Sequence, residues 1–88
     1  MTKKKIIVEN QLGLHARPSA LVVKSASKFR SDLLIKKGNM EVNGKSIMGV
    51  MMLAAEYSSE LELIANGVDE DYMISEVEEL FKSKFSED

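Results

Sequence analysis

Gly13-Leu14-His15-Ala16-Arg17-Pro18 is the stretch that places the only histidine of this 88-residue chain at the beginning of a helix. Proline is tolerated in the first turn of a helix, because its missing N–H would have no intrahelical partner there. Apolar and small residues then recur at helical spacing as far as Phe29. We therefore expect a helix over residues 16–29, with His15 at or just outside its N-terminus.

His15 in that position would meet several unpaired backbone N–H groups and the positive end of the helix dipole, with Arg17 close by in sequence. Such a helix start binds dianions readily. A neutral imidazole is a nucleophile near pH 7, and amides plus a guanidinium would stabilise a phosphoryl group carried on its ring. The alternative is a solvated histidine or a local cap in a glycine-flanked loop. From these six residues alone, that alternative is the more common case.

Four segments outside this stretch have the composition of strands. Residues 5–9 are short and β-branched, and residues 60–65 alternate between polar and apolar, which places Ile6 and Leu61 among the inward-facing side chains. Residues 32–36 and 40–43 flank Gly38 and Asn39, a pair that accepts the positive φ of a tight hairpin turn. These last two segments should therefore pair as antiparallel strands.

Two further helices are expected in the second half of the chain. Ser46 precedes an apolar run over residues 47–53 and is a natural N-cap, and Asp69 should cap a last helix. The apolar stripe of that last helix consists of Met73, Ile74, Val77, Leu80, Phe81 and Phe85. The order strand, helix, strand, strand, helix, strand, helix predicts an α+β fold. Its economical form is a four-stranded, mainly antiparallel sheet with three helices on one face.

Length, charge and composition exclude several classes of function. Residues 1–88 are too few for a second core and predict a single domain. A net charge of −2 without a basic stripe argues against nucleic-acid binding, while one histidine and no cysteine make a metal site improbable. The basic N-terminus is followed by an apolar run too short for export, and no transmembrane-length stretch appears. We expect a cytoplasmic protein with no metal, no cofactor and no membrane insertion.

Two separate motifs resemble those of one known family. Gly13-Leu14-His15-Ala16-Arg17-Pro18-Ser19 and, some thirty residues later, Lys45-Ser46-Ile47-Met48-Gly49-Val50-Met51 resemble HPr, the histidine-containing phosphocarrier of the bacterial phosphoenolpyruvate:sugar phosphotransferase system. Ala26-Ser27-Lys28-Phe29 and Asn66-Gly67-Val68-Asp69-Glu70 also look like family stretches in the right order. The resemblance covers nearly the whole chain and implies an open-faced β-sandwich with strand order 1-4-2-3.

The resemblance also implies roles for individual residues. His15 would accept a phosphoryl group on Nδ1 from phospho-enzyme I and pass it to the IIA domains of sugar permeases, with Arg17 stabilising the charge. Such a protein is a carrier without independent turnover, and we expect a monomer. Ser46, besides capping a helix, would match the serine that HPr kinase/phosphorylase modifies. A docking face would comprise Leu14, Ile47, Met48 and Met51. We predict that all four are exposed.

Two stretches depart from the family pattern. Residues 54–59 stand where many HPr sequences are rich in glycine and glutamine, and Gln11-Leu12 replaces residues often seen before Gly13. The chain could therefore be an HPr paralogue of a nitrogen-type phosphotransferase chain. It could also act mainly as a regulatory binding module that docks on a transcriptional regulator when Ser46 is phosphorylated.

Overall fold

The computed structural model describes residues 1–86, and its strands form one antiparallel sheet in the order β1-β4-β2-β3. The elements are, in chain order, β1 (Thr2–Ile7), α1 (Ala16–Ala26), β2 (Asp32–Lys37), β3 (Met40–Asn43), α2 (Ile47–Met52), β4 (Glu60–Asn66), α3 (Glu70–Lys82) and the 3₁₀ turn η1 (Lys84–Ser86). This topology confirms the predicted α+β class and strand order.

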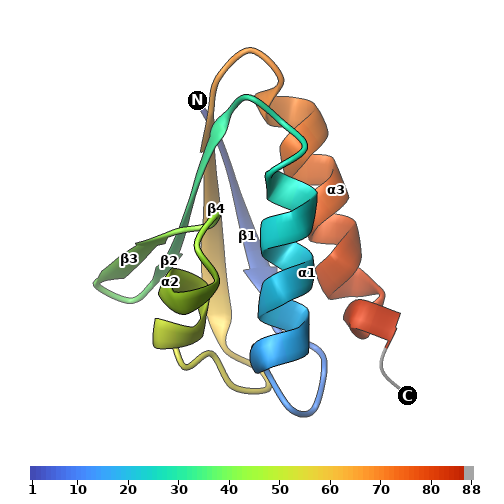
Figure 1. Cartoon of the computed structure of the whole chain (residues 1–88). Coiled ribbons are helices and arrows are strands. Elements are labelled where there is room, and N and C mark those ends of the chain that lie inside the picture. The colour runs from blue at the N-terminus through green and yellow to red at the C-terminus, as the bar shows by residue number, and fades with distance from the viewer. Residues whose placement is uncertain (87–88) are drawn as a thin grey trace.

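The helices cover one face of the sheet (Figure 1). α1 and α3 lie side by side, and α2 lies beside the N-terminal half of α1 (Figure 1). The core between the layers contains the inward residues of the strands, such as Leu33, Ile35 and Leu63, together with Val22 of α1 and Val77 of α3. The alternation of the strands and the apolar stripes of the helices therefore meet in one core, as expected for a two-layer fold.

Several element boundaries differ from the predicted ones, and three of the differences have a clear physical reason. β1 ends at Ile7, but Val8 is fully buried and its N–H still donates to the Ser59 carbonyl at 2.9 Å. α1 ends at Ala26, because the N–H groups of Lys28 and Phe29 bond three residues back, to the carbonyls of Ser25 and Ala26. α3 ends at Lys82, so Phe85 lies beyond the helix and not in its stripe.

Phe85 is buried despite lying outside α3. It is the middle residue of three, Lys84 to Ser86, whose φ is positive, at 55°, 55° and 57°. The backbone therefore takes a left-handed conformation directly after the helix. This turn brings the Phe85 ring edge-on to Phe81, with 4.9 Å between the ring centroids. The aromatic contact holds the C-terminal turn against the end of α3 and close to the start of α1.

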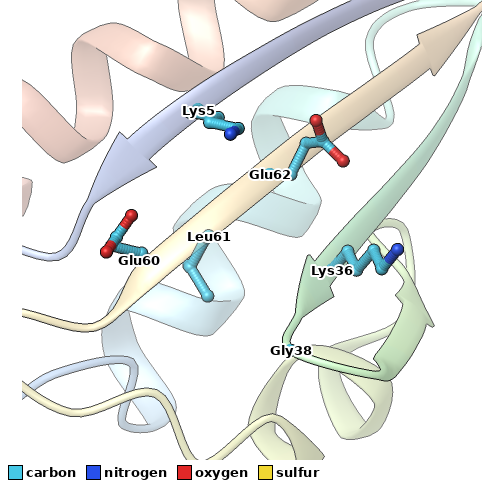
Figure 2. Close-up of a pocket in the computed structure, with 6 residues that line it drawn as sticks. All are labelled: Lys5, Lys36, Gly38, Glu60, Leu61 and Glu62. Atoms are coloured by element: carbon cyan, nitrogen blue, oxygen red, sulfur yellow. The ribbon is translucent and has the colours of Figure 1, made fainter.

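The face of the sheet opposite the helices is a ladder of alternating charge. Lys5 lies opposite Glu62, Glu62 opposite Lys36, and Lys36 opposite Glu41, across all neighbouring strands of the sheet. Figure 2 shows the side chains of Lys5, Glu62 and Lys36 on three adjacent strands. Opposite charges in directly opposed positions support strand pairing. This row makes the middle of the uncovered face polar, while Ile7, Leu34 and Ile64 add apolar side chains to the same face.

Asp69 does not cap α3 with its side chain, so that prediction was wrong. Asp69 occupies the N-cap position, but its carboxylate accepts from the backbone N–H groups of Arg30 and Ser31 and from the Ser31 hydroxyl. Glu70 instead accepts from the Gly67 N–H at 3.0 Å. The Asp69 carboxylate therefore joins the turn before β2 to the turn before α3, since three donors from another segment outcompete the amides of its own helix.

This cluster predicts a dependence of stability on acid pH. The Ser31 hydroxyl, with help from the Arg30 N–H, lowers the pKa of Asp69 from its ordinary value of 3.8 to about 2. A lowered pKa contributes stability that is present above about pH 4 and is lost as the pH falls toward 2. Asp69→Asn should therefore be less stable than the parent at pH 7, and the difference should shrink between pH 4 and pH 2. Urea unfolding across this range measures it. The exposed Glu79→Gln on the same helix is the control, and a constant difference would contradict the assignment.

Candidate functional site

His15 is the N-cap residue of α1, as the sequence predicted. Its backbone is extended, with φ −76° and ψ −168°, and helical backbone begins at Ala16. The N–H groups of Ala16 and Arg17 have no carbonyl within α1 to bond, because they belong to the first turn of the helix. The His15 side chain makes no capping hydrogen bond to this turn and is half-buried. The imidazole therefore lies at the positive end of the helix dipole.

The loop before His15 is closed by hydrogen bonds at its base. The Asn10 side-chain amide donates to the Gly13 carbonyl at 2.6 Å, and the Gly13 N–H donates back to the Asn10 carbonyl at 3.1 Å. Gly13 has φ +69°, and a Cβ there would lie 2.3 Å from the Ala55 carbonyl oxygen. Only glycine fits this turn, because both its φ and its surroundings exclude a side chain.

Leu14 is only 4% exposed, so the prediction that it lies on an exposed docking face was wrong. Its N–H donates to the Ala55 carbonyl at 2.8 Å, and its carbonyl accepts from the Ser19 hydroxyl at 3.1 Å. The left-handed turn at Gly13 directs the next side chain inward, where Leu14 joins the hydrophobic core. Leu14 therefore anchors the backbone directly before His15 in the core and offers no surface to a partner.

Arg17 is engaged by the C-terminal turn. Its Nη1 donates to the Phe85 carbonyl at 2.8 Å, across a separation of 68 residues. The sequence placed Arg17 near His15 along the chain but carried no signal for this contact, because the acceptor is a backbone carbonyl in a distant segment. A guanidinium has five N–H donors, so Arg17 can hold this bond and still offer donors to an anion at the helix start.

Ser46 caps α2 as predicted, and its hydroxyl accepts from the Gly49 N–H at 3.1 Å. The predicted exposure of three neighbouring side chains is also confirmed: Ile47 is 44% exposed, Met48 75% and Met51 43%. Met52, at 64%, belongs to the same surface, although the predicted docking face does not include it. We call Ile47, Met48, Met51 and Met52 the α2 patch. Val50 is fully buried beneath it.

The hydroxyl of Ser46 should make a measurable contribution to stability. Ser46→Ala removes the acceptor for the Gly49 N–H, and loss of such a cap costs about 1 kcal/mol. Ser46→Asp keeps an acceptor at the same position and should lose much less. Chemical denaturation of the two variants beside the parent protein makes the comparison. Equal stabilities for Ser46→Ala and the parent would show that the cap contributes nothing to the free energy of unfolding.

The α2 patch adjoins the start of α1. α2 packs beside the N-terminal half of α1 (Figure 1), and the segment after α2 supplies the Ala55 carbonyl that holds Leu14. The start of α1 and the segment that carries the patch are thus joined directly. None of the helices within residues 1–86 is both long and apolar enough to cross a membrane.

A histidine at the N-cap position of a helix, beside an apolar patch and on an open four-stranded sheet, defines a small α+β protein suited to receive an anionic group and to dock on other proteins. The family model for the HPr component phosphorylation site of the phosphotransferase system matches residues 2–83. The chain belongs to the HPr family. HPr proteins are phosphocarriers of this system and not enzymes with their own turnover.

Individual relatives agree with this assignment. The phosphocarrier protein HPr of Treponema pallidum is 48% identical over 88 residues, with complete coverage of both chains. The HPr-like protein Crh of Bacillus subtilis is 47% identical over 70 residues, covering 80% of this chain and 82% of Crh. The crystal structure of HPr-C-His from Thermoanaerobacter tengcongensis matches with a TM-score of 0.96 and 44% identity, covering 100% of this chain and 99% of that one.

Proposed function

We propose that this protein carries phosphoryl groups in a sugar phosphotransferase system, accepting them on His15 from phospho-enzyme I and donating them to IIA domains. The observation that supports this proposal most directly is the position of His15. The only histidine of the chain occupies the N-cap position of an eleven-residue helix and is half-buried beside the α2 patch. We further propose that the protein works in the cytoplasm and meets its partners in turn as a monomer.

The transfer step needs little from the protein beyond position and charge. The Nδ1 lone pair of His15 attacks phosphorus in line, an N–P bond forms, and the N–P bond to the histidine of enzyme I breaks with its electron pair returning to that ring. The first-turn N–H groups of Ala16 and Arg17 would stabilise the phosphoryl oxygens, together with the guanidinium of Arg17. This stabilisation is modest at a half-buried site, which allows the group to leave for a IIA domain by the reverse step.

The α2 patch would provide the apolar part of the docking face, through Ile47, Met48 and Met51. Methionine side chains adapt to several partner surfaces, which suits a carrier that must dock on both a donor and an acceptor. The patch is exposed while Val50 and Leu53 fix α2 to the core. Docking by this face would place a partner's histidine over the start of α1.

Ser46 would be the regulatory site, modified by an HPr kinase/phosphorylase. A phosphate at the cap of α2 is electrostatically compatible with the helix start, so the fold would not change. The added charge would lie next to Ile47 at the edge of the patch. It would disfavour docking of a partner surface that makes apolar contacts there. Regulation would therefore act by blocking docking.

Phosphorylation of the full chain tests the carrier function. Incubation with phosphoenolpyruvate and enzyme I should add the mass of one phosphoryl group, and this group should be lost in acid and retained in alkali. Incubation with ATP and an HPr kinase should instead give an acid-stable group on Ser46. A chain that gains no mass from phosphoenolpyruvate and enzyme I would contradict the carrier proposal.

The similarity to Crh favours one alternative. Crh, whose solution structure is known, is named the catabolite repression HPr of Bacillus subtilis. This chain could likewise act mainly as a binding module for a transcriptional regulator. Acid-stable phosphate on Ser46, with no transfer through His15, would support that alternative. Acceptance from a nitrogen-type enzyme I but not from the sugar-type enzyme would assign the chain to a nitrogen-type system.

A further inference from the structure

We propose that Met48, Met51 and Met52 form an oxidation site through which hydrogen peroxide reversibly weakens docking of this protein on its phosphoryl donor. The chemistry of the site stands on the geometry of α2 alone. Its consequence rests on the proposed carrier function, so the experiment below reports on the two separately.

The three thioethers share one face of α2. Positions 48, 51 and 52 are spaced i, i+3 and i+4, which brings side chains together on a helix surface. Their exposed fractions are 75%, 43% and 64%, so peroxide can reach each side chain from solvent. The side chain of Met73 on α3 is fully buried and provides an internal reference in the same molecule.

Sulfur chemistry in this chain is confined to methionine, because its 88 residues include six methionines and no cysteine. Met1 and Met40 are also exposed, but both lie outside α2. Half of the methionines of the chain are therefore gathered in a six-residue helix that lies beside the N-terminal half of α1 (Figure 1).

The oxidation step balances without any group beyond the peroxide. A lone pair of the thioether sulfur attacks one peroxide oxygen, an S–O bond forms, the O–O bond breaks, and water leaves after proton transfer. Sulfur loses two electrons and the peroxide gains them. The product, methionine sulfoxide, is polar and chiral, and methionine sulfoxide reductases reverse the change.

A sulfoxide should impair docking without disturbing the fold. Each of the three side chains is exposed in the free protein, Met51 least at 43%, so the sulfoxide oxygens can be hydrated there and unfolding should change little. When a partner covers the patch, the sulfoxide oxygen must be buried without a designed donor, which disfavours the complex. We expect a roughly tenfold rise in the KM of enzyme I for the oxidised protein, with little change in the limiting rate at His15.

The experiment compares the full-length protein before and after mild peroxide treatment. Peptide mass mapping should find sulfoxide at Met48, Met51 and Met52 well before Met73. Phosphorylation by enzyme I and phosphoenolpyruvate should show the rise in KM, the thermal midpoint should stay constant, and reductases specific for each sulfoxide epimer should restore the original KM.

Two variants sharpen the test, each compared with its own untreated form. Met48→Leu/Met51→Leu/Met52→Leu conserves apolar volume and should lose the response to peroxide. Met40→Leu removes an exposed methionine outside α2 and should keep the full response. Failure of the untreated parent protein to accept a phosphoryl group would overturn the carrier function. An unchanged KM after oxidation of all three side chains, or equally rapid oxidation of Met73, would overturn this inference.

Discussion

His15→Ala is expected to reduce phosphoryl uptake from enzyme I from one group per chain to none. The chain has no other histidine, so no second imidazole can replace the missing nucleophile. The fold should survive, because the His15 side chain lies at the surface end of α1 and is only half-buried. We expect a loss of stability within about 1 kcal/mol, as for a surface substitution. Intact mass after incubation with phosphoenolpyruvate and enzyme I measures the uptake.

A matched variant separates loss of the nucleophile from loss of structure. Ser27→Ala alters an exposed residue at the opposite end of the same helix and should accept a phosphoryl group like the parent. Ser27→Ala should also pass its phosphoryl group on to a IIA domain, and His15→Ala should not. Acid-labile phosphate on His15→Ala would place the acceptor elsewhere and remove the basis of the proposed mechanism.

Gly13→Ala is expected to destabilise the protein by at least about 2 kcal/mol and to slow transfer through His15. The backbone at Gly13 has φ +69°, which costs an L-residue about 1–2 kcal/mol. The new Cβ would also lie 2.3 Å from the Ala55 carbonyl oxygen and 3.0 Å from the Glu56 Cα, so backbone must move. That movement breaks the hydrogen bond from Leu14 to Ala55, which fixes the residue before His15. Denaturant unfolding and single-turnover phosphorylation measure the two effects.

Gly38→Ala is the matched control for this prediction. Gly38 has a similar φ of +58°, but a Cβ there meets no atom within 4 Å, and the residue lies in the β2–β3 turn (Figure 2). It should lose about 1 kcal/mol from backbone strain and transfer phosphoryl groups normally. The difference between the two alanine variants isolates the crowding against Ala55. Equal losses in stability and transfer would show that the contact with Ala55 is unimportant for His15.

The Gly13 and His15 predictions concern one feature, the fixed geometry of the loop that precedes α1. Asn10 closes the loop, Gly13 turns it, and Ala55 holds Leu14 from the segment after α2. A loop fixed in this way loses little conformational freedom when His15 reacts, which favours an in-line approach of the partner's phosphoryl group. The same connection means that changes in residues 53–56 should reach His15 through the Ala55 carbonyl.

Local patterns in the sequence were sufficient for the order of elements, the start of α1 and the cap of α2. Pro18 restricts where a helix can begin, and Ser46 finds its partner three residues away, so both features depend on short-range chemistry. The alternation of β4 likewise assigned Leu61 to the inward face correctly. The strand order came from the family resemblance, because periodicity alone does not say which strands are neighbours.

Tertiary structure decided the features that join distant segments. Arg17 bonds the Phe85 carbonyl across 68 residues, Ser31 draws the Asp69 carboxylate away from its helix across 38, and Leu14 turns inward because Gly13 packs against Ala55. In each case the decisive partner is a backbone group or a donor from a remote turn, which has no periodicity and no residue signature. These groups meet only where the sheet and helices pack together, and this packing determines which side chains around His15 face solvent.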